Sequence, residues 1–286
     1  MRIALISDIH ANLAALEAVL ADIRHHHPQR IISLGDQVNL GPCPRETLAL
    51  LKSEGVTCLH GNHERYILRA MAGDPAYSGA NFHMLRFNAR LLSPQDITFP
   101  ETLRLSDSIL CTHAMPGDDR FPVYDPQAAY PRLREMNDGL DRPLHILCGH
   151  GHNPTYYAFS NLTVHCIGSV GCMDEAAPGI APYTIAEIDG DGMSLRPYYV
   201  AYDTGRLPAL FLSSGLKAHC PIMARIGLTQ MMNNCDLIID FVAGAQKLSA
   251  ARGEAVISQD TWEEANRRFA WPDGLTTAQF WKQYGG

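Results

Sequence analysis

The chain has 286 residues and a net charge of −7, with 23 lysines and arginines against 30 aspartates and glutamates. A protein that grips nucleic acid through its phosphates needs a basic face, so this balance disfavours nucleic acid as a partner. The chain has no stretch of about 20 apolar residues that could form a membrane-spanning helix. The N-terminus lacks the long apolar region and small-residue cleavage site of a signal peptide, so we expect a cytoplasmic protein.

The first 92 residues alternate between strand and helix patterns. Continuous apolar runs predict buried strands over 2–8, 30–36 and 57–62. Apolar side chains at helical spacing predict helices over 13–23, 44–55, 63–73 and 78–92, and Asn12 is placed as the N-cap of the first. This order indicates a mostly parallel sheet with helices on its faces.

Short strands dominate the next hundred residues. A turn at 106–108 splits 102–114 into two paired strands, and further strands are predicted over 144–150, 156–161, 163–169, 183–192 and 194–202. The sequence Asp-Gly-Asp-Gly at 189–192 predicts a hairpin. We expect this half to form an antiparallel sheet beside the first one, with both sheets packed between helices.

The strand patterns stop after residue 203, and residues 204–286 have helical patterns with an apolar face. This segment also holds all three tryptophans, Trp262, Trp271 and Trp281. We expect one domain over 1–203 and a helical extension over 204–286 that packs on or beside it. One interpretation is that the extension docks on the domain and stabilises it. The alternative is that it narrows the crevice that holds the metal ligands or forms a dimer interface, where aromatic residues are enriched.

Polar side chains with metal-binding groups follow the predicted strands. They are Asp8, His10, Asp36, Asn62, His63, His113, His150 and His152. The carboxyl ends of the strands in an open α/β sheet form the crevice that binds ligands, so these groups should meet there. Carboxylate, amide oxygen and imidazole suit Mn, Fe, Co, Ni or Zn. There are too many ligands for one ion, so we expect two divalent ions with Asp36 as a bridge.

Each of these motifs is weak when it stands alone. A single Asp-x-His or Gly-Asn-His occurs in ordinary turns, and two histidines around a glycine also occur as hydrogen-bonded core residues. The ordered set is much more specific. Burying several carboxylates and imidazoles together without a cation would also be costly.

The ordered motifs SDIHAN, LGDQVNLGP, GNHE, THA and GHGH resemble the calcineurin-like metallophosphoesterase superfamily. The pattern is most similar to its bacterial and archaeal small phosphodiesterase branch. The resemblance implies two packed mixed β-sheets flanked by helices, a four-layer αββα sandwich, over residues 1–203. The helical extension over 204–286 has no counterpart in the pattern of that branch.

The resemblance also implies roles for single residues. Asp8, His10, Asp36 and His152 would hold one metal, and Asp36, Asn62, His113 and His150 would hold the second. Gly151 would allow the tight turn between the last two histidines. Manganese is the metal we expect first, with Fe, Zn, Ni or Co as alternatives.

A hydroxide that bridges the two ions would attack the phosphorus of a phosphodiester or phosphomonoester. Catalysis is assigned to Asp36 and to His63, which would protonate the leaving alkoxide. Glu64 is a candidate to orient His63 because it is adjacent. Asn62, Asn12 and Arg65 are the residues we expect at the small phosphorylated substrate, Arg65 because a guanidinium matches phosphate oxygens.

Two departures bear on the substrate. Leu40 stands where the protein phosphatases and dinucleoside polyphosphate hydrolases of the superfamily have an arginine, and GSVGCMD lacks the arginine of the GSVGxPR pattern. A less basic pocket favours a diester, which carries less charge than a monoester. A catalytically silent metal-binding scaffold for protein interaction, a dinucleoside polyphosphate hydrolase and a protein phosphatase are the alternatives, and self-association is left open.

Overall fold

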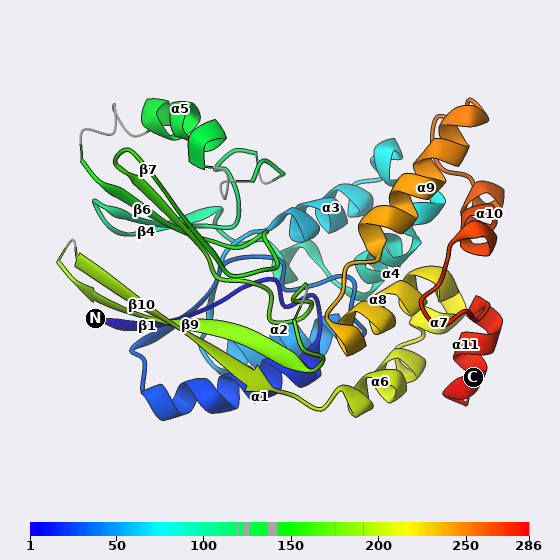
Figure 1. Cartoon of the computed structure of the whole chain (residues 1–286), viewed down its shortest axis with the longest axis horizontal. Helices are drawn as coiled ribbons and strands as arrows, with labels where there is room; N and C mark the ends of the chain where they lie inside the picture. Colours follow the sequence, from blue (N-terminus) through cyan, green and yellow to red (C-terminus); the bar gives the residue numbers. More distant parts are fainter. Residues whose placement is uncertain (119, 123–125, 137–141, 175, 191, 286) are drawn as a thin grey trace.

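Two five-stranded β-sheets form the middle of the protein (Figure 1). The computed structural model describes residues 1–118, 120–122, 126–136, 142–174, 176–190 and 192–285. The first sheet has the order β10 (Gly192–Ala201), β9 (Ile180–Asp189), β1 (Arg2–Ile6), β2 (Arg30–Ser33), β3 (Thr57–Cys58). The second has the order β4 (Thr102–Ser106), β5 (Ile109–Thr112), β6 (Leu144–Cys148), β8 (Leu162–Cys166), β7 (Thr155–Phe159). The expected fold of two packed mixed sheets flanked by helices is confirmed.

Both sheets are mixed, and this corrects the expectation of a separate antiparallel sheet in the second half. In the first sheet β1, β2 and β3 are parallel, while β9 runs antiparallel to β1. In the second, β5, β6 and β8 are parallel and the edge strands β4 and β7 are antiparallel. The predicted hairpin joins β9 to β10 in the first sheet, although its residue 191 lies outside the described residues.

Helices cover the outer faces of the sheets. Helix α1 (Leu13–Ile23) lies against β9 and β10, with α2 (Pro44–Ser53) beside it, and α5 (Pro126–Met136) covers β7 and β8. Helix α5 was not predicted, and Pro131 interrupts its pattern. Helices α3 (Asn62–Met71) and α4 (His83–Leu91) pack against each other. The expected helix over 78–92 is divided into a short turn, Ala80–Phe82, and α4.

The alternation of β1 shows how the layers are held together. Ile3 and Leu5 point into the core between the two sheets, whereas Ala4 and Ile6 join the core on the outer face of the first sheet. All four side chains are fully buried. Successive residues of a strand point to opposite faces, so a strand with apolar layers on both sides reads as a continuous apolar run.

The C-terminal segment is helical, as expected. Its helices are α6 (Leu207–Ser213), α7 (Leu216–His219), α8 (Pro221–Asn233), α9 (Ile238–Ala251), α10 (Gln259–Arg268) and α11 (Thr277–Gln283). Their buried side chains join those of α1 and β9 in one apolar cluster that includes Leu16, Tyr183, Phe211 and Trp281. The helices of the described residues include none with the length and apolar character that crossing a bilayer requires.

Candidate metal centre

The loops that follow the strands hold four of the expected metal ligands in a left-handed backbone conformation. Asp8, His10, Asp36 and His150 have φ values of 50°, 51°, 55° and 67°. This conformation is uncommon for residues other than glycine, and it is found at sites where the surrounding structure enforces it. The strands of both sheets end near the middle of the molecule (Figure 1), which brings these loops together.

Asp8, His10 and His152 form one group of ligand atoms. The Nε2 atoms of His10 and His152 lie 3.2 Å apart. Oδ1 of Asp8 lies 3.9 Å from Nε2 of His10 and 3.8 Å from Nε2 of His152. The other carboxylate oxygen of Asp8 accepts bonds from the Ser7 hydroxyl at 2.5 Å and the His150 amide at 3.0 Å, which fixes the carboxylate.

The second group converges on the amide oxygen of Asn62. This Oδ1 lies 2.9 Å from Nε2 of His113 and 3.0 Å from Nδ1 of His150. Oδ2 of Asp36 lies 3.4 Å from the same nitrogen of His113. The His113 ring is held from behind, because its Nδ1 donates to the Leu34 carbonyl at 2.9 Å. In the neutral ring Nε2 is then the nitrogen with a lone pair facing Asp36 and Asn62.

Asp36 lies between the two groups. Its carboxylate forms one cluster with His10 and His63 and another with Asp8 and His113, so it lies close to members of both groups. Its second oxygen, Oδ1, accepts a 2.8 Å bond from the backbone amide of His63. The backbone packs closely here, because a Cβ atom on Gly61 would lie 2.2 Å from Asp36 Oδ1. The position is therefore restricted to glycine, as the motif GNHE has it.

The donor set fits divalent cations. Oδ1 of Asp8 and Nδ1 of His10 are buried and make no hydrogen bond to the described residues. Two imidazole nitrogens that bind one ion at about 2.1 Å lie about 3.0–3.4 Å apart, which matches the spacing of His10 and His152. A buried carboxylate oxygen without a donor is costly, and a cation removes this cost.

The electrostatics of the cluster favour an ionised Asp36 and neutral rings at His10 and His150. Burial would raise the pKa of Asp36, but the positive charges of His113 and His63 outweigh it and hold the pKa well below its usual range. Burial lowers the pKa of His10 well below its usual value, and His63 and His152 lower it further. Burial also lowers the pKa of His150 to about 4. Two other rings differ: burial would lower the pKa of His113, but the charge of Asp36 outweighs it and raises the pKa to about 9, and the contact with Asp174 likewise outweighs burial and raises the pKa of His152 well above its usual value. A metal ion that binds these two rings would displace their protons.

His63 lies at the edge of the cluster and is oriented by Asn39, not by Glu64. Its Nδ1 lies 2.8 Å from the Asn39 amide nitrogen, and its Nε2 lies 3.9 Å from Asp36 Oδ2. Glu64 turns away from the imidazole and accepts bonds from the backbone amides of Asp36, Gln37, Val38 and Gly61. The adjacency argument for Glu64 was therefore wrong, because this carboxylate fixes the Asp36 loop.

The sequence interpretation missed Asp174. Its Oδ2 lies 3.5 Å from His152 Nδ1, and it forms a third cluster of metal-binding groups with His152 and Cys172. A carboxylate behind a metal-binding histidine fixes the ring and increases its basicity. Asp174 stands in the segment GSVGCMD, at the position where the branch pattern has an arginine. The sequence shows that the arginine is absent, but it does not show that Asp174, which replaces it, contacts His152.

The contacts differ from the expectation at Asn12 and Gly151, and they leave the expectation for Arg65 open. Asn12 is fully buried and is the N-cap of α1, because its Oδ1 accepts from the Ala15 amide and its Nδ2 donates to the Gly171 carbonyl. It therefore has a structural role in place of the expected substrate contact. The positive φ in the turn between the last two histidines is at His150, not at Gly151. Arg65 lies half-buried in the first turn of α3, and its phosphate contact stays a prediction.

Residues 1–171 match the sequence model of the calcineurin-like phosphoesterase family. The chain belongs to this family. An uncharacterized protein of Methanocaldococcus jannaschii is 44% identical over 159 residues, which are 53% of this chain and 63% of that protein. The match therefore spans less than two thirds of that relative.

Two solved structures share the fold of this phosphoesterase family member. A metallophosphoesterase from Sphaerobacter thermophilus is 25% identical with a TM-score of 0.60, and the similarity covers 79% of this chain and all 100% of that one. A hypothetical protein from Pyrococcus horikoshii OT3 is 17% identical with a TM-score of 0.62, and the similarity covers 82% of this chain and 99% of that one. In both comparisons the matched part of this chain is longer than residues 1–203, so the structural likeness continues into the helical extension.

Proposed function

We propose that this protein is a phosphodiesterase that uses two divalent metal ions, with manganese as the preferred metal. The position of Asp36 carries the proposal, because this single carboxylate is shared by the two groups of ligand atoms. Asp8, His10 and His152 would hold one ion with Asp36, and Asn62, His113 and His150 would hold the other. Such ions would stabilise charge on the phosphate oxygens and supply a nucleophile from water near neutral pH.

The side chains of the protein supply the remaining chemistry. His63 faces the cluster with Nε2 while Asn39 holds Nδ1, so Nε2 is the atom placed to give a proton to the leaving oxygen. Burial lowers the pKa of His63, which makes it a stronger proton donor when it is charged. Asp36 also fixes the start of α3 by accepting the backbone amide of His63, so the metal site and the proton donor are positioned together.

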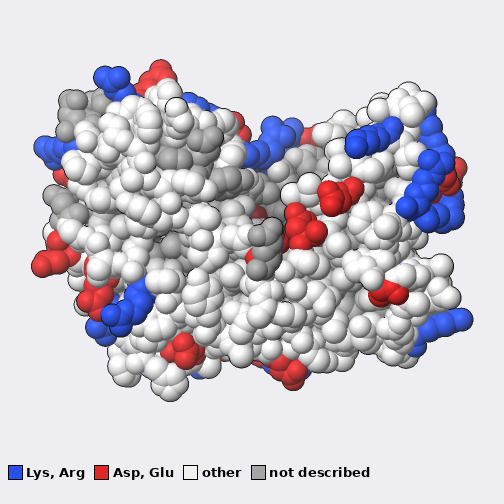
Figure 2. All heavy atoms as spheres, in the orientation of Figure 1, with Lys and Arg blue, Asp and Glu red and all other residues white. Residues whose placement is uncertain are grey.

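The charges around the cluster favour a diester over a monoester. Asp174 adds a carboxylate behind His152, and the side chain of Leu40 is buried and carries no charge. A phosphodiester carries one negative charge near neutral pH, whereas a monoester approaches two. Figure 2 shows carboxylates near the middle of the face between α5 and α9, where the surface is hollowed. Repulsion from these groups should therefore be smaller for the diester.

The test compares bis(p-nitrophenyl) phosphate with p-nitrophenyl phosphate as substrates of the protein reconstituted with Mn²⁺. We expect higher kcat/KM for the diester, and metal analysis should give two ions per chain. Asp36→Asn should lose both activity and metal, whereas Asp240→Asn, an exposed residue of α9, should match the wild type. Two bound ions without hydrolysis of either compound would favour the metal-binding scaffold. A higher rate with the monoester would overturn the assignment of the substrate class.

A further inference from the structure

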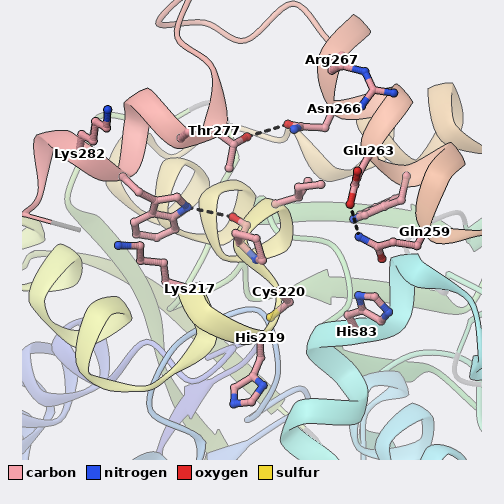
Figure 3. A pocket seen from close by; sticks show the side chains of 15 residues that line it. His83, Lys217, His219, Cys220, Gln259, Glu263, Asn266, Arg267, Thr277 and Lys282 are labelled. Carbon is pink, nitrogen blue, oxygen red and sulfur yellow. Dashed lines mark hydrogen bonds between the residues drawn. The ribbon is translucent and has the colours of Figure 1, made fainter.

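A cavity of about 660 Å³ lies among helices α4, α7, α8, α10 and α11, apart from the metal cluster (Figure 3). Its apolar wall is formed by Pro221, Ile222, Trp262, Ala278 and Trp281. Cavities of 300–1,000 Å³ with apolar and aromatic walls are typical of sites for small organic ligands. None of the eight cluster residues lines this cavity, so it would be a separate site.

A smaller basic cavity of about 240 Å³ adjoins the first one. The imidazoles of His83 and His219 line both cavities, and Arg86, Phe87 and Arg90 complete the smaller one. His83, Arg86 and Arg90 come from α4 at spacings of three and four residues, so they lie on one face of the helix. Figure 3 shows His83 and His219 at one end of the larger cavity.

Among the described residues, no carboxylate balances the charges of Arg86 and Arg90 in the smaller cavity. No carboxylate is among the described residues that line it, and none of its four basic side chains has a carboxylate partner in the described part of the chain. Arg86 is nevertheless held in place, because its Nη1 donates to the carbonyls of Tyr77 at 2.6 Å and Gly79 at 2.8 Å. A fixed guanidinium beside other basic groups is a site for a phosphate.

Burial and the repulsion between like charges both lower pKa values in the smaller cavity. Burial lowers the pKa of His83, and the positive charges of Arg86 and Arg90 lower it further. Burial and Arg90 also lower the pKa of Arg86. Like charges gathered on one helix face destabilise the fold. A bound anion would remove this repulsion, and Lys217, on the wall of the larger cavity, would add a further positive charge.

We propose that the two cavities form a second ligand site, which binds a nucleotide. The phosphate would occupy the smaller cavity between His83, Arg86, Arg90 and His219. The base would lie against the apolar wall at Pro221 and Ala278, which are exposed, whereas Trp262 and Trp281 line the cavity with only 2% and 3% of their surface exposed. Gln259 and Asn266, both on α10, line the same cavity and offer Oε1 and Nδ2 to the edge of the base. The amide nitrogen of Gln259 donates to Glu263, whose carboxylate also lines the cavity, and Oδ1 of Asn266 accepts from Thr277.

The experiment titrates the protein with AMP, adenosine and inorganic phosphate, followed by calorimetry and by tryptophan fluorescence. Fluorescence reports on this cavity because Trp262 and Trp281 line it. Each titration is made with Mn²⁺ and again after EDTA, which separates this site from the metal cluster. We expect AMP to change the fluorescence in both conditions and to bind at least about tenfold more tightly than adenosine or phosphate alone.

Substitutions on the walls locate the binding. Arg90→Gln should weaken AMP binding about tenfold, because it removes one charged phosphate partner. Ala278→Glu, an exposed position on the wall of the larger cavity, should weaken it by a similar factor through bulk and charge. The matched control is Arg196→Gln, an exposed residue of β10. Absence of AMP binding after EDTA, equal binding of adenosine, or equal affinity in Arg90→Gln and the control would each overturn the proposal.

Discussion

The amide nitrogen of Asn39 lies 2.8 Å from Nδ1 of His63. Asn39 lies in the loop after β2 and His63 in the first turn of α3, and Asn39 has a left-handed backbone with a φ of 71°. Asn88 of α4 stands behind this pair, since its amide nitrogen lies 3.4 Å from Asn39 Oδ1 and also donates to the Met84 carbonyl. The direction in which Nε2 of His63 faces the cluster is therefore set by a chain of amide groups that reaches into α4.

Replacing Asn39 with alanine should leave His63 in place but without a fixed ring orientation. We expect kcat to fall about 10- to 100-fold while the metal content stays unchanged, because a misplaced proton donor affects only the transition state. Steady-state kinetics and metal analysis measure the two effects. Asn233→Ala, an exposed asparagine at the end of α8, is the matched control. A loss of metal together with activity would show that Asn39 supports the cluster and not the donor.

His63 itself is tested by the leaving group. His63→Asn should keep the metal ions and lose about 10²- to 10⁴-fold in kcat with an alkyl ester, the usual contribution of a general acid. The loss should be smaller with a nitrophenyl ester, because nitrophenolate leaves without full protonation. Rates of methyl p-nitrophenyl phosphate and a dialkyl phosphate, each compared with the wild type, measure the difference. Equal losses for the two classes would indicate that His63 binds the phosphate.

The clustering of the candidate metal ligands could be predicted because each of them stands shortly after a strand. β1 ends at Ile6 and β2 at Ser33, so the loops that carry Asp8 and Asp36 leave the sheet at the same edge. The pairing of β9 with β1 could not be predicted, since it joins residues such as Arg2 and Glu187 that are far apart in the sequence. The contact of Asp174 with His152 likewise depends on how the loop after β8 folds back.

Asp174→Asn should weaken metal binding at the group that contains His152. Removing the carboxylate behind a metal-binding histidine typically costs 10- to 100-fold in affinity or activity, and we expect a loss in that range. Competition of Mn²⁺ with a fluorescent chelator measures the affinity of each site. Asp240→Asn serves as the control because it also removes one carboxylate from the surface. Unchanged affinity at both sites would exclude a supporting role for Asp174.

His165 predicts a pH dependence of stability away from the cluster. Burial lowers the pKa of His165 to about 4, and the charge of His145 lowers it further, whereas the unfolded chain has a value of about 6.5. The unfolded state therefore binds more protons between pH 6.5 and 4, and the free energy of unfolding falls as the pH is lowered through this window. Above pH 6.5 the ring of His165 is neutral in the folded and the unfolded chain, so it no longer lowers the free energy of unfolding.

Urea unfolding at pH 7.5, 6 and 5 tests this dependence. His165→Gln should lose less stability than the wild type on going from pH 7.5 to 5, by on the order of 1 kcal/mol after solvent screening of the partly exposed ring. His25→Gln, an exposed histidine in the turn after α1, should follow the wild type at each pH. Parallel curves for His165→Gln and the wild type would show that other groups cause the dependence.

Arg225 connects α8 to the end of the chain. Its side chain is fully buried, its Nη2 bonds Asp273 at 2.6 Å, and its Nη1 bonds the Leu275 carbonyl at 3.0 Å. The guanidinium carbon also lies 3.7 Å from the centre of the Trp271 ring, a close cation–π contact. Because these partners all lie between α10 and α11, Arg225 holds the C-terminal segment on the helices that cover the first sheet.

Arg225→Met should therefore lower the free energy of unfolding by about 2–3 kcal/mol, since it leaves the partly buried Leu275 carbonyl without its donor and removes the cation–π contact. Denaturant unfolding followed by tryptophan fluorescence measures the loss. Arg268→Met removes an exposed arginine that pairs with Glu264 four residues earlier, and it should cost less than about 0.5 kcal/mol. A loss in Arg225→Met no larger than in this control would mean that the extension docks through its apolar contacts alone. The expected loss of about 2–3 kcal/mol in Arg225→Met, together with an unchanged metal content, would assign the extension a role in stability.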